Sequence, residues 1–178
     1  MNLAIALSYL LSTLTDLYVT AVLLRLLLQW VRADFYNPVV QFLVAITNPP
    51  LTRLRRWIPS IGRLDTASVV LMLVLELLSA WLVSRLGSTP LSGGALLLLA
   101  VQKLLMTLLW TYFFLIIVAV VLSWIGRGSN HPAVPLVYQL TRPVLAPIRR
   151  FVPAIGGVDL SPLFALIAIR FLLLLLGW

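Results

Sequence analysis

Several ionisable residues lie inside long apolar stretches of the sequence. Four of them, Asp16, Arg25, Glu76 and Arg170, form a candidate network. A charge in the interior of a membrane is costly, so such residues usually face an opposite charge or a water-filled path. Two kinds of chemistry are open to this set: ion pairs that hold helices together, or a path for ions or protons. Their charges sum to zero, as a buried structural network would prefer.

A second candidate site is a stretch of seventeen residues that occurs twice, at residues 49–65 and, 94 positions later, at residues 143–159. Eight of its seventeen positions are identical without a gap. Each copy carries two adjacent arginines: Arg55 and Arg56 in the first, Arg149 and Arg150 in the second. Such a pair can bind anionic lipid or a docking partner, and it is also typical of a cytoplasmic loop. Both interpretations stay open.

Each copy ends in an aspartate, Asp65 or Asp159, directly before an apolar run. A carboxylate in that place can accept hydrogen bonds from the first free amides of a helix and interacts favourably with its positive end. We therefore predict that both aspartates are helix caps. A ligand for a cation or a substrate is the alternative.

The residue types exclude several kinds of catalysis. The chain has no cysteine and a single histidine, His131, so thiolate chemistry and histidine metal clusters are absent. No Ser-His-Asp set or catalytic carboxylate pair is evident. The sequence predicts a protein that is not an enzyme and has no metal or cofactor. His131 precedes Pro132 and corresponds to Asn37 in the first copy, which indicates a residue at a helix start, with pH sensing as the alternative.

Composition indicates a membrane protein, because 62% of the residues are hydrophobic and only 10% are charged. The formal net charge is +8. These cations lie between long apolar runs, where anionic lipid head groups are the nearest partners. We expect contacts with anionic lipids and with membrane proteins or a second copy of the chain, and no direct binding of nucleic acid.

The apolar runs predict an all-α protein with four transmembrane helices, at about residues 3–31, 66–86, 94–125 and 160–178. They form two parallel helix–loop–helix repeats, residues 1–86 and 94–178, related by a pseudo-twofold axis along the membrane normal. The amphipathic loops 32–65 and 126–159 complete the repeats. In the first loop, Asn37 and Pro38 indicate a helix start, and Pro49 indicates a break between two short helices.

Basic residues predict the orientation. The two long loops together contain nine arginines, whereas the short link at residues 87–93 contains no basic residue. Both loops should therefore face the cytoplasm, and both termini should lie outside it, in a multi-pass protein of a bacterial inner membrane.

Two of the apolar-run charges, Glu76 and Arg170, occupy equivalent positions under the offset of 94. Each lies eleven residues past the aspartate that precedes its span, roughly 16 Å along a helix and thus near mid-membrane. We predict that they pair across the pseudo-twofold axis, with Asp16 as the rival partner of Arg170. Lys103 is expected in the outer part of its span, where it can snorkel.

The pattern R-R-x-x-P-x-x-G-x-x-D after P-x-L, present twice, resembles the YggT family of small integral membrane proteins. The second copy, PVLAPIRRFVPAIGGVDLSP, is close to the family pattern. The first copy has Arg63 where the second has Gly157. The resemblance implies a bacterial inner-membrane protein linked with osmotic-stress tolerance and cation homeostasis, and it carries over no enzymatic activity or cofactor. Shorter relatives are linked with cell division, and plastid relatives with nucleoid distribution and cytochrome maturation.

The resemblance and the residues together favour a non-enzymatic scaffold or assembly factor in the osmotic or envelope stress response. The alternative is a potassium or sodium transporter or channel component, which the intramembrane charges favour. No span with a Gly/Pro interruption in its middle is evident, and that weakens the transporter hypothesis.

Overall fold

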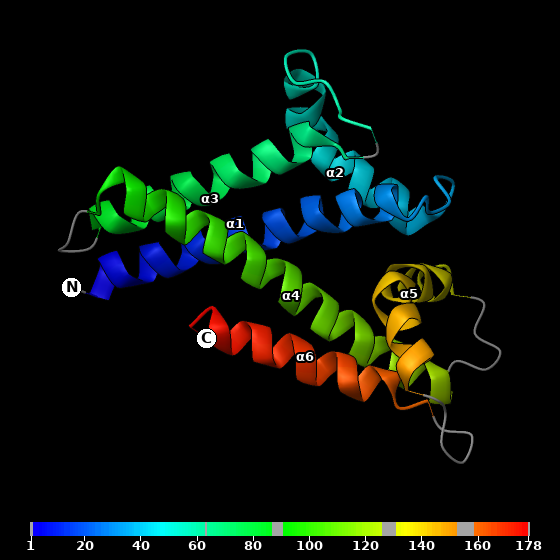
Figure 1. Ribbon diagram of the computed structural model, residues 1–178. Coiled ribbons are helices and arrows are strands. Elements are labelled where there is room, and N and C mark those ends of the chain that lie inside the picture. Colours follow the sequence, from blue (N-terminus) through cyan, green and yellow to red (C-terminus); the bar gives the residue numbers. More distant parts are fainter. Residues whose placement is uncertain (1, 63, 87–90, 126–130, 153–158, 178) are drawn as a thin grey trace.

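A computed structural model describes residues 2–62, 64–86, 91–125, 131–152 and 159–177. These residues form helices and no named strand, which confirms the all-α prediction for the described part of the chain. Figure 1 shows α2 and α5 toward the same side of the molecule and both termini away from them. The helices are α1 (Asn2–Trp30), α2 (Pro38–Leu54), α3 (Thr66–Leu86), α4 (Gly93–Ile125), α5 (Ala133–Phe151) and α6 (Ser161–Leu175).

Three helices, α1, α3 and α4, are long and apolar enough to cross a membrane. This agrees with three of the four predicted spans and indicates a multi-pass membrane protein. The prediction for residues 160–178 is not confirmed, because α6 has 15 residues. At about 1.5 Å per residue it is roughly 22 Å long, shorter than a ~30 Å hydrocarbon core. It ends before Gly177, whose φ is 85°.

The packing has α1 and α4 at its centre. Helix α1 packs against α2, α3, α4 and α5, and helix α4 also packs against α3, α5 and α6. The two repeats are called the first unit (residues 1–86) and the second unit (residues 94–178). They meet where α3 packs on α4 and where α1 packs on α4 and α5. The equivalent of the α3–α4 contact in a twofold arrangement would be α6 on α1, which is not among the closely packed pairs of the described residues. The contacts between the units therefore do not follow the expected pseudo-twofold axis.

One stripe of α6 makes its contacts with the rest of the protein. Ser161, Ala165, Ile169 and Leu173 recur every four residues and are all buried. In lipid, helices associate through close packing and hydrogen bonds, and small residues such as alanine and serine let the backbones approach. The rest of the helix is largely exposed, so α6 is held from one side.

The first amphipathic segment differs from the prediction of two short helices. Helix α2 is continuous from Pro38 to Leu54, although Pro49 and Pro50 lie inside it. A proline has no N–H, so Pro50 leaves the carbonyl oxygen of Ile46 without its usual donor. The hydroxyl of Tyr18 donates to that oxygen at 3.3 Å. Contacts with α1 therefore compensate for a lost helical hydrogen bond, which sequence patterns alone do not reveal.

The start of α2 agrees with the prediction. The side chain of Asn37 accepts a hydrogen bond from the backbone N–H of Val39 at 2.9 Å, and Pro38 opens the helix. The amide nitrogen of Asn37 also donates to the carbonyl of Pro132 in the second unit at 2.7 Å. His131 accepts from the backbone N–H of Ala133 at 3.2 Å, as expected of a residue at a helix start. The starts of the two surface helices are thus linked.

Candidate functional site

Three charged side chains from three helices meet within the bundle. The Nζ of Lys103 in α4 lies 2.5 Å from Oδ1 of Asp16 in α1 and 3.1 Å from Oε2 of Glu76 in α3. Glu76 is fully buried. We call these three residues the Lys103 cluster. It joins the two units, because both carboxylates come from the first unit and the ammonium comes from the second.

Lys103 lines two cavities. One, of about 570 Å³, is lined by Glu76 and Lys103, and the other, of about 540 Å³, by Asp16 and Lys103. Oε1 of Glu76 is buried and has no hydrogen-bond donor within the described residues. A carboxylate oxygen in that position could accept from water or ligate a cation. Further polar residues line the first cavity (Ser12, Ser79, Ser84 and Gln102) and the second (Thr20, Thr107 and Thr111).

The predicted pair of Glu76 and Arg170 is wrong. Glu76 pairs with Lys103, while Arg170 is exposed and lies beside Leu166, Ile167 and Phe171 of its own helix. Arg170 follows the buried Ile169 by one residue, which turns it about 100° away from the packed stripe. The structure also differs from the expectation that Lys103 snorkels, because its ammonium binds two carboxylates within the bundle. One signal points to this role. Lys103 is the only lysine in the chain, and it is the eleventh residue of the 33-residue helix α4, well inside the apolar run.

Arg25 is buried but lies apart from the Lys103 cluster. Its Nη1 donates to Oγ1 of Thr47 and its Nη2 to Oδ1 of Asn48, both at 2.8 Å. Both acceptors are in α2 and both are neutral. Arg25 thus connects α1 to α2, and the four charges predicted to form one network are divided among three places.

The repeated arginines and aspartates bind each other. Nη2 of Arg55 lies 2.5 Å from Oδ2 of Asp65, and Nε of Arg149 lies 2.8 Å from Oδ2 of Asp159. We call these two ion pairs the Arg–Asp clasps. Each connects the end of an amphipathic helix to the start of the next apolar helix. The sequence pattern presents the arginines and the aspartates as separate features, and it does not predict their mutual contact.

The two clasps differ in burial. The side chain of Asp65 is 2% exposed and that of Asp159 is 38% exposed. Asp65 accepts from the hydroxyl of Ser68 at 2.6 Å, and Asp159 accepts from the backbone N–H of Ser161 at 2.9 Å. The two aspartates therefore bind groups in the first turns of α3 and α6, close to the predicted role of helix caps.

Burial opposes ionisation of both aspartates, but hydrogen bonds outweigh it. At Asp65 the bonds from Arg55 and Ser68 bring the pKa below its ordinary value. At Asp159 the bonds from Ser161 and the charge of Arg149 lower the pKa as well. Both carboxylates are therefore ionised at neutral pH, as the clasps require.

Comparison with known proteins shows to which family the chain belongs. The family model described as CCB3/YggT matches residues 4–86 and 98–178. The chain belongs to the CCB3/YggT family. The YggT protein of Escherichia coli K12, which is described as uncharacterised, is 37% identical over 158 residues, covering 88% of this chain and 81% of that protein. No solved structure matches the chain.

Two further YggT-family relatives are also described as uncharacterised. A protein of Vibrio alginolyticus is 41% identical over 175 residues, covering 97% of this chain and 94% of its own length. A protein of Pseudomonas aeruginosa is 42% identical over 164 residues, covering 91% of this chain and 83% of its own. These relatives match nearly the whole chain.

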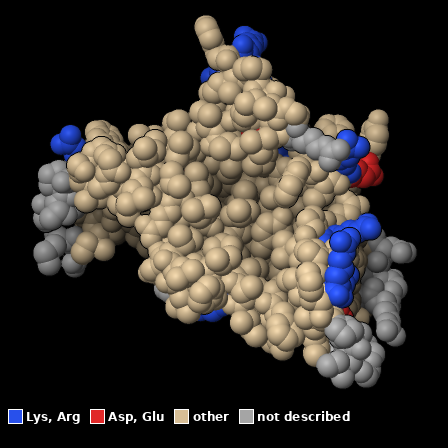
Figure 2. Space-filling model, viewed as in Figure 1, with Lys and Arg blue, Asp and Glu red and all other residues tan. Residues whose placement is uncertain are grey.

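In each arginine pair of this YggT-family chain, the two arginines have different surroundings. The first arginine of each pair, Arg55 or Arg149, forms a clasp. The second, Arg56 or Arg150, is exposed. Most of the face seen in Figure 2 is free of charge, with basic and acidic side chains at its margins. Among the described residues, no three His, Asp or Glu side chains gather as a metal site.

Proposed function

We propose that this YggT-family protein is a non-enzymatic scaffold or assembly factor of the bacterial inner membrane, acting in the osmotic or envelope stress response. The observation that carries the proposal is the pair of Arg–Asp clasps, which fix α2 and α5 to the starts of α3 and α6. Arg56 and Arg150 then remain available for anionic lipid or for a membrane-protein partner. The stress setting comes from the family resemblance.

A second candidate is a potassium or sodium transporter or channel component, and the Lys103 cluster favours it. Glu76 is fully buried, faces a cavity with several polar side chains and has one oxygen without a donor in the described residues. Ionisable residues at such depth commonly mark ion or proton paths. Under the scaffold hypothesis, the same three charges form a structural connection between the units.

Ion flux separates the two functions. The full chain would be reconstituted into liposomes, and potassium and sodium flux would be compared with that of empty vesicles. A scaffold predicts equal flux. Flux above that of empty vesicles that Glu76→Gln abolishes, and that Arg170→Gln leaves unchanged, would exclude a purely scaffolding role.

Growth after osmotic upshift tests the scaffold proposal itself. We expect a strain lacking the protein to recover with the wild-type chain and to fail with the double variant Arg56→Gln/Arg150→Gln, because the exposed charges are lost while the clasps stay. Arg56→Lys/Arg150→Lys is the matched control and should retain at least part of the function. Full recovery with the glutamine variant, at equal protein level, contradicts the proposed surface.

The position of the C-terminus tests the fourth span. If α6 crosses the membrane together with α1, α3 and α4, a reporter fused after residue 178 should lie outside the cytoplasm, on the same side as the N-terminus. A cysteine placed at Arg56 should then be labelled only from the cytoplasmic side. A cytoplasmic reporter at residue 178 together with the same Arg56 labelling would show that α6 does not cross.

A further inference from the structure

We propose that a cavity between α1 and α2 binds a phosphate-bearing anion, either an anionic phospholipid head group or a soluble phosphate ester. The cavity has a volume of about 700 Å³ and lies near the Trp30 end of α1. Neither proposed function requires this site, and it would exist under both. Its charged lining residues are Arg25, Arg32, Arg55 and Asp65.

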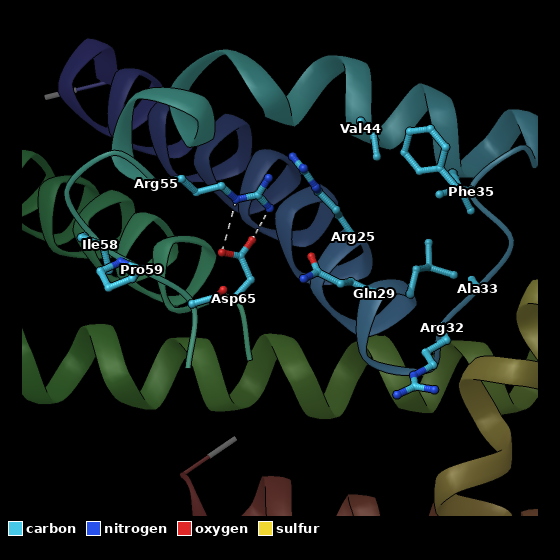
Figure 3. Close-up of a pocket in the computed structure, with 13 residues that line it drawn as sticks. Arg25, Gln29, Arg32, Ala33, Phe35, Val44, Arg55, Ile58, Pro59 and Asp65 are labelled. Carbon is cyan, nitrogen blue, oxygen red and sulfur yellow. Dashed lines mark hydrogen bonds and ion pairs between the residues drawn. The ribbon is translucent and has the colours of Figure 1, made fainter. Parts of the chain in front are cut away.

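The first argument is charge. Three arginines and one aspartate line the cavity, and the aspartate is already bound by Arg55. The lining therefore carries a formal charge of about +2 that no carboxylate in the lining balances. Figure 3 shows Arg55 joined to Asp65, with Arg25 beside them and Arg32 at the far end of the cavity. An anion placed between Arg25 and Arg32 would offset this excess.

The second argument is the burial of Arg25. It is 7% exposed, and the acceptors found for its guanidinium, Thr47 and Asn48, are neutral. Burying a charge is costly unless an opposite charge accompanies it. Among the described residues, no carboxylate lies within ion-pair distance of Arg25. A bound anion would supply the missing charge, and guanidinium groups match the oxygens of a phosphate particularly well.

The third argument is the form of the site. Val40, Val44 and Phe35 form part of its wall, so the cavity offers apolar as well as charged side chains. A phosphate joined to a glycerol and acyl chains combines the same two kinds of group. Arg32 adopts a φ of 55°, which is uncommon for a residue other than glycine. This backbone conformation is costly and often occurs in binding sites.

The second unit lacks the same set of charges. The positions equivalent to Arg25 and Arg32 under the offset of 94 are Ala119 and Gly126. Arg149 and Asp159 repeat the clasp, but a clasp alone is electrically neutral. The predicted anion site therefore belongs to the first unit, and residues of the second unit provide internal controls.

Native mass spectrometry of the full-length protein in detergent tests the proposal. Phosphatidylglycerol would be titrated against phosphatidylcholine of the same chain length, and inorganic phosphate and glycerol 3-phosphate would be titrated separately by thermal shift. We expect Arg25→Gln to weaken binding of the anion about tenfold and Arg32→Gln about fivefold. Val44→Trp should weaken binding by filling the cavity without changing its charge. Arg170→Gln removes an exposed arginine outside the cavity and should bind as the wild type does.

The probes separate the two sources of phosphate. Preferential retention of phosphatidylglycerol without a response to the soluble phosphates identifies a lipid head group. A response to inorganic phosphate or glycerol 3-phosphate that Arg32→Gln weakens identifies a soluble ligand. If Arg25→Gln does not fold, Arg32→Gln and Val44→Trp decide. Binding equal to wild type in both, or a wild-type protein that prefers none of the anionic probes, would overturn the proposal.

Discussion

Replacing Lys103 with methionine is expected to lower the free energy of unfolding by about 3–5 kcal/mol. Methionine has a similar length, so the change removes the charge with little loss of volume. It leaves Asp16 and the fully buried Glu76 side by side without their cation. Two carboxylates in an apolar environment repel each other and cannot both stay charged without a large penalty. Unfolding in mixed detergent, followed by circular dichroism, would measure the loss.

A rescue experiment distinguishes a lost ion pair from a general packing defect. In the triple variant Asp16→Asn/Glu76→Gln/Lys103→Met, no charge is stranded, so we expect much of the stability to return. Arg170→Met is the matched control, because it removes an exposed cation that has no ion pair in the described residues. It should change stability by less than about 1 kcal/mol. Losses that simply add up in the triple variant would contradict a coupled cluster.

Replacing Asp65 with asparagine is expected to cost about 1.5–3 kcal/mol, because a buried charge-assisted hydrogen bond to Arg55 is lost. The equivalent change, Asp159→Asn, should cost less than about 1 kcal/mol, since its side chain is 38% exposed. The two variants form a matched pair, with the same chemistry at two levels of burial. Equal losses would show that burial does not determine the strength of the clasps.

The pH dependence of stability gives a second measure of the first clasp. The pKa of Asp65 is lowered in the folded protein by its bonds to Arg55 and Ser68, which outweigh the opposing effect of burial. Its contribution is thus complete above the unfolded pKa of about 3.9 and is lost as the pH falls through the lower folded pKa. The melting temperature of the wild type should fall across that acid window. In Asp65→Asn this part of the fall should be missing.

The clasps show which parts of the candidate site can be predicted from the sequence. Residue spacing identified both arginine pairs and both aspartates, because identical positions recur at one offset. It did not predict that Arg55 binds Asp65, since the two residues are ten positions apart, one at the end of α2 and the other before the start of α3. Helical periodicity describes neighbours on one helix face, and it carries no information about a contact made across such a turn.

The intramembrane charges show a second limit. Matching depths led to the pairing of Glu76 with Arg170, but depth fixes only one of the coordinates of a side chain. Rotation about the helix axis decides the partner, and α6 turns Arg170 away from its buried stripe. The asymmetric packing of α3 on α4 then brings Lys103 to Glu76. The pseudo-twofold symmetry expected from the repeat could not predict the pair of Glu76 and Lys103, because that contact does not obey the symmetry.

The length of α6 explains the remaining difference. The apolar composition of residues 160–178 predicts a span, yet the helix covers only Ser161–Leu175. Composition measures whether a segment tolerates lipid, whereas a crossing also requires a continuous helical rise. The three longer helices satisfy both conditions.

The Lys103 cluster has a consequence for how the two halves of the chain depend on each other. The positions equivalent to Asp16, Glu76 and Lys103 are Trp110, Arg170 and Tyr9, so neither half can supply all three charges. A symmetric dimer of first halves would bring together four carboxylates and no lysine. Within this cluster the first unit supplies both carboxylates and the second unit supplies the ammonium. The two halves are therefore not interchangeable at this place.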